Sequence, residues 1–435
     1  MIETTGLELQ RRRILACAFA CSPPGDSGLG GGEDILGWNL VFQIAKRHKV
    51  WALTHPDNKA AIEQELSDNP NSNLNFCYVG LPTWLRPMIK IQGGIQAYYF
   101  LWQIRSYFSA KNLHRQLGFD LFHHITYAND WMASFIGALL PVPYVRGPGG
   151  GAHRTPRGFE REYPLGGCIW EKIRSLGQWI FRHDPIFMKG HHRASAILAC
   201  NQEALDQASS KWPDKVKFFP VNGITSSDLA TAALPASKHS EFRVLTAGTL
   251  IRVKGFGLAI KAFKKFGATH PDAIFDIVGS GPELPRLKKI AKSLDPQGQI
   301  RFKPRMERGR LLAEMAASDV FLFPSLRDGG GAVVIEAMAA GTPVVCLNAG
   351  GPAVHTTAEC GIKIDPDNPD NAVVHLAEAL ERLYQDPGLK ETLGQAARAR
   401  AEEVYHWDRL GERLMGIYED TFDQANTRVE AGHSS

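Results

Sequence analysis

The first part of the chain alternates apolar runs with one glycine-rich break. Residues 14–20 are a continuous run of apolar side chains, and residues 21–32 are rich in Gly, Pro and Ser. Residues 34–47 then carry apolar side chains at helical spacing, and residues 50–54 are apolar again. This succession of strand, glycine loop, helix and strand predicts the βαβ opening of a doubly wound α/β domain.

The same succession restarts in the second half of the chain. Residues 242–247 predict a strand, and a Gly/Lys turn and a helix over residues 257–266 follow it. Short apolar runs predict further strands at 121–125, 144–145, 196–199, 273–278, 320–323 and 343–346. The fold class is therefore predicted as α/β, with two doubly wound Rossmann-like lobes that face each other across a cleft.

The domain boundaries follow from this repeat. We expect an amino-terminal domain over residues 1–225, a linker over 226–240 and a carboxyl-terminal domain over 241–405. The linker is expected because its Ser- and Ala-rich sequence has no clear periodicity. Residues 406–435 are expected to form a carboxyl-terminal helix with a frayed tail. Ligands of such sheets bind beyond the carboxyl ends of the strands, so the site is expected there.

Composition excludes several classes of protein. The chain has 435 residues, of which 44% are hydrophobic and 22% are charged, and this apolar content excludes a disordered chain. The formal charge of +4 is too small to argue for nucleic-acid binding. Seven scattered cysteines without a Cys-x-x-Cys pair indicate reduced thiols in a cytoplasmic protein and argue against zinc. Residues 11–21 resemble a short signal sequence, but the glycine loop and helix that follow favour a buried strand.

Residues 84–117 combine aromatic with Lys and Arg side chains and predict an amphipathic helix with a cationic side. Two interpretations stay open. The helix contacts the inner face of a membrane peripherally, or it docks on its own domain.

Three glycine turns follow strands of the second lobe. The turn over residues 248–255 ends in Arg252 and Lys254 just before a helix, an arrangement that suits a diphosphate but also occurs as plain surface charge. Residues 279–282 form a second turn, which a tight bend explains equally well. In the third turn Asp328 precedes three glycines, and a second acid follows eight residues later in the next helix. These two carboxylates could clamp two hydroxyl-bearing parts of one ligand.

Residues 324–345 resemble a pattern of the family-four retaining glycosyltransferases, which have the GT-B fold: Pro-Ser-x-x-Glu-Gly-Phe-Gly-x-x-x-x-Glu-Ala-Met-Ala-x-Gly-x-Pro-Val-Val. Asp328 stands in place of the first Glu, and Gly330 in place of the Phe. Trp407 and Tyr418 resemble the family's carboxyl-terminal helix, which is expected to pack back on the amino-terminal domain. The resemblance covers about residues 221–418.

The resemblance implies the donor site. Its expected residues are Gly31, Gly32, Arg252, Lys254, Gly279, Gly281, Asp328, Gly329, Gly330, Gly331, Ala332 and Glu336. Lys254 and Arg252 would hold the donor diphosphate, although the family's arginine position is occupied here by Thr249. Glu336 would bind the ribose, and Asp328 would contact the transferred sugar. The amides of residues 329–332 would face the sugar and the phosphate, and Gly279 would lie beside the nucleobase.

The first lobe would supply the acceptor side. Residues 120–127 resemble the family's Asp-x-x-His-x-His strand end, which makes His123 and His124 catalytic candidates beside Asp328; the alternative is that they are buried structural histidines. Residues 146–154 follow another strand and suit an anionic acceptor group, or form a mobile loop. The acceptor candidates there are Gly149, Gly150, His153 and Arg154.

The implied reaction moves a sugar from a nucleotide-diphosphate donor to a hydroxyl of a glycan or lipid-linked acceptor. The donor is a co-substrate, so no resident cofactor is expected. No Asp-x-Asp motif stands beside the turns, and no metal is expected. A nucleotide-sugar epimerase or hydrolase of the same fold and a degenerate subunit that only binds its ligand remain alternatives.

Overall fold

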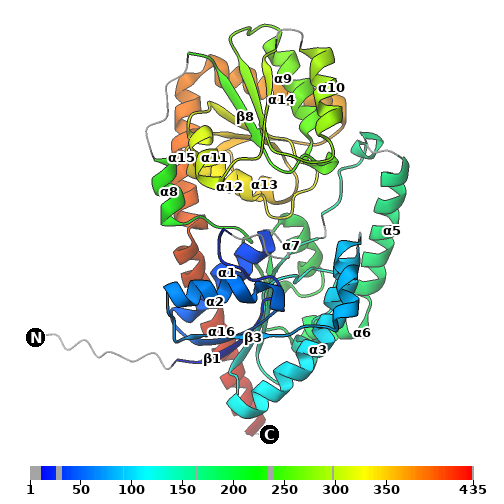
Figure 1. Cartoon of the computed structure of the whole chain (residues 1–435), viewed down its shortest axis with the longest axis vertical. Helices are drawn as coiled ribbons and strands as arrows, with labels where there is room; N and C mark the ends of the chain where they lie inside the picture. The colour runs from blue at the N-terminus through cyan, green and yellow to red at the C-terminus, as the bar shows by residue number, and fades with distance from the viewer. Residues whose placement is uncertain are drawn as a thin grey trace, which may run out of the picture.

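The computed structural model describes residues 11–25, 32–91, 93–151, 153–162, 165–233, 240–295 and 298–433. Two α/β lobes each contain one parallel sheet with helices around it (Figure 1). The predicted fold class is confirmed. No helix within the described ranges is both long and apolar enough to cross a membrane.

The amino-terminal sheet has the strand order β3-β2-β1-β4-β5-β6-β7. Its strands are β1 (Arg13–Cys17), β2 (Lys49–Thr54), β3 (Leu74–Tyr78), β4 (Leu121–His124), β5 (Tyr144–Gly149), β6 (Ala196–Ala199) and β7 (Val216–Phe218). The longer helices of this lobe are α1 (Gly32–Ala45), α2 (Lys59–Asp68), α3 (Gly94–Leu117), α5 (Leu165–Arg182), α6 (Pro185–Arg193) and α7 (Gln202–Ser209), and α4 (Phe135–Leu139) is a short one. The strand order reverses between β1 and β4, the place where such sheets bind ligands.

The carboxyl-terminal sheet has the order β10-β9-β8-β11-β12-β13. Its strands are β8 (Arg243–Ala247), β9 (Ile274–Val278), β10 (Ile300–Lys303), β11 (Val320–Phe323), β12 (Val344–Leu347) and β13 (Gly361–Ile364). The helices around it are α9 (Phe256–Gly267), α10 (Leu284–Leu294), α11 (Arg308–Ala316), α12 (Ala332–Ala339), α13 (Gly350–His355), α14 (Pro369–Gln385) and α15 (Pro387–Tyr405). The order reverses between β8 and β11, so the turns after these two strands share one switch point.

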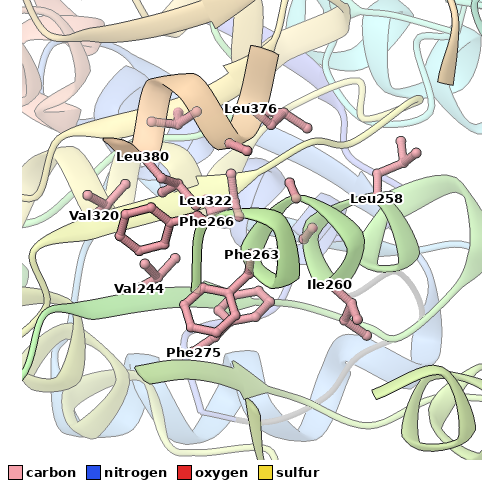
Figure 2. Packing of buried hydrophobic residues seen from close by; sticks show 14 of the residues in the cluster. Val244, Leu258, Ile260, Phe263, Phe266, Phe275, Val320, Leu322, Leu376 and Leu380 are labelled. Carbon is pink, nitrogen blue, oxygen red and sulfur yellow. The ribbon is translucent and has the colours of Figure 1, made fainter. Parts of the chain in front are cut away.

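One face of this second sheet is buried under α9 and α14 (Figure 2). Phe263 of α9 stacks on Phe275 of β9 with ring centroids 5.1 Å apart, and Leu322 of β11 belongs to the same cluster. The strands are buried and nearly continuously apolar, as parallel strands covered by helices require. This core fixes the strand ends from which the glycine turns leave.

The last helix, α16 (Trp407–His433), returns to the amino-terminal lobe. Trp407, Leu410, Leu414 and Tyr418 pack in the same buried cluster as residues of β1 and β4. The two connections between the lobes also touch, because Ile224 N donates to Tyr405 O at 2.9 Å and Trp407 N donates to Ile224 O at 3.0 Å.

Three local expectations are corrected. The linker contains α8 (Ser226–Ala232), which a capping box begins: Asp228 N donates to Thr225 Oγ1 at 3.1 Å, and Thr225 N donates to Asp228 Oδ2 at 2.9 Å. Such a short helix shows no periodicity in the sequence. The segment expected as one helix over residues 84–117 is divided at Gly93 into a 3₁₀ stretch (Thr83–Lys90) and α3. The tail expected to be frayed continues as helix to His433.

Candidate functional site

Asp328 organises the turn after β11. Its Oδ1 accepts hydrogen bonds from Gly330 N at 3.2 Å and Gly331 N at 3.0 Å, and its Oδ2 pairs with Lys254 Nζ from the turn after β8. Burial alone would raise the pKa of Asp328, but Lys254 and the two amides outweigh it and lower that pKa. Two of the four amides expected to face a donor are therefore engaged by Asp328 itself.

Four side chains hold the carbonyl groups of this turn. Gly330 O accepts from His355 Nε2 and from Asn222 Nδ2, both at 2.8 Å. Gly329 O accepts from Asn201 Nδ2 at 3.3 Å and from Cys200 Sγ at 3.5 Å. Asn201 and Cys200 belong to the amino-terminal lobe and Asn222 to its end, so both lobes position the turn.

Glu336 lies on α12, one helix turn beyond the glycines. It pairs with Arg308 of α11, and Arg308 Nε lies 2.8 Å from Asp228 Oδ1 of α8. Burial raises the pKa of Glu336, and Arg308 partly opposes that effect. Glu336, which was expected to bind a ribose, thus already has a cationic partner in Arg308. Asp228 in the linker helix shares this arginine.

Arg252 is directed to another partner. Its Nε lies 2.9 Å from Glu283 Oε2, and Arg286 Nη1 lies 3.0 Å from the same oxygen. Arg252 and Arg286 share the single carboxylate of Glu283, so the group keeps one positive charge, and a diphosphate at Arg252 would compete with this acid.

Gly279 and Gly281 serve the packing of two turns against each other. A Cβ at Gly279 would lie 2.0 Å from Gly248 O, and one at Gly281 would lie 2.4 Å from Leu250 O. Leu250 N also donates to Ser280 O at 2.9 Å. The close approach of the two turns explains these glycines without a nucleobase.

The loop after β5 reaches the glycine turn of the other lobe. A Cβ built at Gly329 would lie 3.2 Å from His153 Cε1. Burial, with help from Arg327 and Arg174, lowers the pKa of His153 to about 4, so its imidazole is neutral near pH 7. Its Nδ1 is buried and makes no hydrogen bond within the described part of the chain.

The other acceptor candidates differ in position. A Cβ at Gly149 would lie 2.1 Å from Ala128 O, and one at Gly150 would lie 2.6 Å from Cys200 Sγ, so both glycines allow close packing. Arg154 is exposed. Gly31 lies outside the described residues, and Gly32 begins α1.

His123 and His124 are completely buried in the amino-terminal lobe. His123 Nδ1 lies 2.7 Å from Tyr418 Oη, and its Nε2 lies 2.6 Å from Gly147 O, so both ring nitrogens have partners. His124 Nε2 lies 2.6 Å from Tyr99 Oη. This geometry favours the structural alternative for His123. The Nδ1 of His124 is buried and has no hydrogen-bond partner within the described residues, so a catalytic role for His124 stays a prediction.

Sequence reasoning missed two groups at the site. Glu33 follows the first glycine loop directly, and this position could have marked it. Its Oε2 accepts from Tyr127 N at 3.0 Å, and burial raises its pKa to about 7. His355 supports Gly330, with its Nδ1 2.9 Å from Tyr405 Oη, and no motif in the sequence points to it. Among the described side chains, no three His, Cys, Asp or Glu converge as metal ligands; whether activity needs a metal stays a prediction.

Comparison with known proteins finds a family match for the carboxyl-terminal lobe. Residues 233–400 match the family model described as "Glycosyl transferases group 1". A GDP-mannose-dependent monoacylated alpha-(1-6)-phosphatidylinositol monomannoside mannosyltransferase of Corynebacterium glutamicum is 33% identical over 175 residues, which are 39% of this chain and 44% of that relative. The chain spans about half the length of this and two further curated glycosyltransferases that it matches.

Solved structures extend the likeness over both lobes. A glycosyltransferase of Rickettsia africae superimposes with a TM-score of 0.64 at 14% identity, covering 95% of this chain and 99% of that one. Alr3699/HepE of Anabaena in complex with UDP and glucose superimposes with a TM-score of 0.59 at 16% identity, covering 94% and 100%. At these identities the likeness shows the fold. Residues 233–400 therefore match the glycosyl transferases group 1 family, and the two lobes of the chain have the GT-B fold.

Proposed function

We propose that this protein transfers a sugar from a nucleotide-diphosphate donor to a hydroxyl group, with retention of the anomeric configuration. The observation that carries the proposal is the placement of Lys254, Asp328 and the start of α12 at one switch point of the carboxyl-terminal sheet. A cation and a helix start at the carboxyl ends of parallel strands form an anion site. The relatives and structures whose names include a GDP-mannose donor or UDP support this choice of ligand.

The electrostatics suit the departure of a diphosphate. As the bond to the sugar breaks, negative charge grows on the leaving phosphate, and preorganised positive groups lower the barrier. Lys254 Nζ and the amino end of α12 provide such groups without rearrangement of the backbone. Asp328 shares Lys254 and is oriented by two amides, so its carboxylate is held in place for the hydroxyl groups of a transferred sugar.

The amino-terminal lobe would complete the site for the acceptor. His153 lies against Gly329, and its neutral ring has a buried Nδ1 that can accept a hydrogen bond from a hydroxyl. Because the loop over residues 149–151 packs closely on Ala128 and Cys200, it holds this ring at the boundary between the lobes. A glycan or a lipid-linked sugar alcohol is the class of acceptor that we propose, with the nucleotide sugar as co-substrate, without a metal, at the inner membrane face.

Thermal-shift binding with a panel of nucleoside diphosphates and nucleotide sugars tests the donor site. A ligand at 100 times its dissociation constant should stabilise the protein by about 2.7 kcal/mol. Glu336→Ala should lose this shift, whereas Glu402→Ala, on the exposed side of α15, should keep it. No shift with any nucleotide would refute the proposal.

Turnover then separates the alternatives. NMR of the product should show the donor's anomeric configuration in a new glycosidic bond, and activity should survive addition of a chelator. Donor consumption to free sugar at the same rate with and without acceptors would instead indicate a hydrolase. Donor binding without any turnover would indicate a subunit that only binds its ligand.

A further inference from the structure

Helix α5 presents its apolar side to solvent. Ile173, Leu176, Trp179 and Ile180 are each more than half exposed. Their spacing of three, four and seven residues places them on one face, which we call the outer face of α5. A helix that only completes a domain turns such a face to the core, so the fold of this chain gives no reason for this one.

The opposite, polar side of α5 attaches the helix to the protein. Arg174, Gln178 and Arg182 recur every four residues. Gln178 Nε2 donates to Gly151 O at 3.3 Å, Arg174 Nη2 donates to His153 O at 3.5 Å, and Arg182 Nη2 lies 3.8 Å from Asp130 Oδ1. The helix is therefore held by polar contacts to the acceptor loop, with its apolar side outward.

The surroundings of the outer face are cationic. Residues 165–193, from the start of α5 to the end of α6, contain five Lys and Arg against two acids, Glu171 and, before α6, Asp184. Asp184 caps α6, where its Oδ1 accepts from Ile186 N at 2.8 Å and Phe187 N at 2.9 Å. Of the cations, Lys172 and Lys189 are exposed.

Helix α3 adds a second surface of the same character. Residues 69–119 contain five Lys and Arg and no acid at all. Leu101, Arg105 and Phe108 form an exposed stripe on α3. Figure 1 shows α3, α5 and α6 on the same side of the amino-terminal lobe. Helix α4 links α3 to α6, since Gln103 of α3 accepts from Phe135 N and Arg193 of α6 donates to Leu140 O.

We propose that the outer face of α5, flanked by the cations of α3 and α6, docks on the surface of an anionic lipid bilayer. Exposed Ile, Leu and Trp insert at the level of the headgroups, and flanking Lys and Arg are attracted by anionic lipids. A second copy of this chain fits less well, because pairing two such faces would bring cations against cations. This extends the possible membrane contact of residues 84–117 to a different helix.

Docking in this orientation would place the enzyme at a lipid-linked acceptor, and this role of the docking rests on the proposed function. Because α5 also holds the loop that carries His153, docking would bring the acceptor side of the site to the lipid surface. The binding test below needs no nucleotide sugar, so its failure and the failure of the proposed transfer are distinguishable.

Flotation of the full chain with two kinds of vesicle tests the proposal: phosphatidylcholine alone, and phosphatidylcholine mixed with phosphatidylglycerol. We expect binding to the mixed vesicles only, weakening as salt is raised. The variant I173S/L176S/I180S should bind at least tenfold less than the parent. Lys172→Glu and Lys189→Glu, each made in the parent, should bind more than about fivefold less, because each replaces an attraction by a repulsion. Phe42→Ser, which removes an exposed aromatic ring from α1, is the matched control and should bind as the parent does.

The result that overturns the proposal is flotation that is absent in the parent, or equal in the parent and the triple variant. Light scattering covers the alternative occupant: a dimer that the triple variant dissolves, without lipid binding, would assign the face to a second copy. Thermal melting shows whether the triple variant is folded. If it is not, the two lysine variants, which leave the apolar contacts intact, decide the outcome.

Discussion

Lys254 and Asp328 form an ion pair between the turns that leave β8 and β11. The pair joins the two strands at the switch point of the sheet, and Asp328 Oδ1 meanwhile holds the amides of Gly330 and Gly331. One carboxylate thus fixes both the cation and the shape of the glycine turn. A bound diphosphate would find Lys254 already in place and would share it with Asp328.

Lys254→Met should reduce donor turnover by about 10²–10³-fold, because the growing charge on the leaving phosphate loses its cation. It should also cost stability, about 1–3 kcal/mol, since Asp328 stays buried with only amide partners. Adding Asp328→Asn should restore part of the stability and none of the activity. Activity assays and chemical denaturation of the three variants check this; a fully active Lys254→Met would remove Lys254 from the mechanism.

Glu336→Gln should weaken binding of a nucleoside diphosphate by about 10–100-fold, because a hydroxyl loses a charged acceptor. The 2′-deoxy and 3′-deoxy analogues give the control by calorimetry. If Glu336 binds the ribose, the parent should bind one of the deoxy analogues more weakly than the full nucleotide. Glu336→Gln should bind that analogue and the full nucleotide about equally. If each analogue loses the same affinity in parent and variant, Glu336 does not bind the ribose.

The sequence predicted the two sheets and the strand ends because apolar runs and glycine turns are local patterns. It could not show that Lys254 pairs with Asp328 whereas Arg252 pairs with Glu283, because Glu283 belongs to a different turn. The two adjacent histidines looked alike in the sequence, but partners distant along the chain, Tyr418 and Tyr99, decide their environment. Contacts between segments far apart in sequence leave no periodic trace.

Glu33 should make stability depend on pH. Its pKa is about 7 in the folded protein against 4.5 for the free side chain, so the folded state holds this proton at pH values where the unfolded chain has released it. The free energy of unfolding therefore falls as pH rises from 4.5 to 7, by up to about 3 kcal/mol from this group. Glu33→Gln should remove that loss.

Melting curves of the parent and of Glu33→Gln at about pH 5 and about pH 8 test whether Glu33 lowers the stability as pH rises. The variant should gain stability relative to the parent only at the higher pH. Glu63→Gln, at an exposed pair with Lys59 on α2, is the matched control and should show no such crossing. A parallel shift of Glu33→Gln and parent at both pH values would contradict the prediction.

His355→Leu should destabilise the glycine turn after β11, because His355 supports its Gly330 carbonyl group. The variant loses the hydrogen bond to Gly330 O and leaves the Tyr405 hydroxyl without its Nδ1 acceptor, at a cost of about 2–3 kcal/mol. Donor affinity should fall with it, because the turn is no longer held. Tyr405→Phe removes only the hydroxyl behind His355, keeps the hydrogen bond to Gly330 O, and should cost about 1 kcal/mol with donor affinity nearly unchanged. Calorimetry on both variants separates the two effects.

The chain has Gly330 where the family pattern has Phe, and the close approach of a neighbouring segment explains this difference. A Cβ at Gly330 would lie 2.5 Å from Asn222 Nδ2 and 2.6 Å from Val221 Cγ2, both in the segment that leaves the amino-terminal lobe. Gly330→Ala should therefore push the turn and this segment apart and cost about 1–3 kcal/mol. Adding Asn222→Ala and Val221→Ala should restore the fit and leave only the lost hydrogen bond to Gly330 O. Melting curves should show a lower melting temperature for Gly330→Ala alone; an unchanged melting temperature would mean that the turn accommodates the added methyl group.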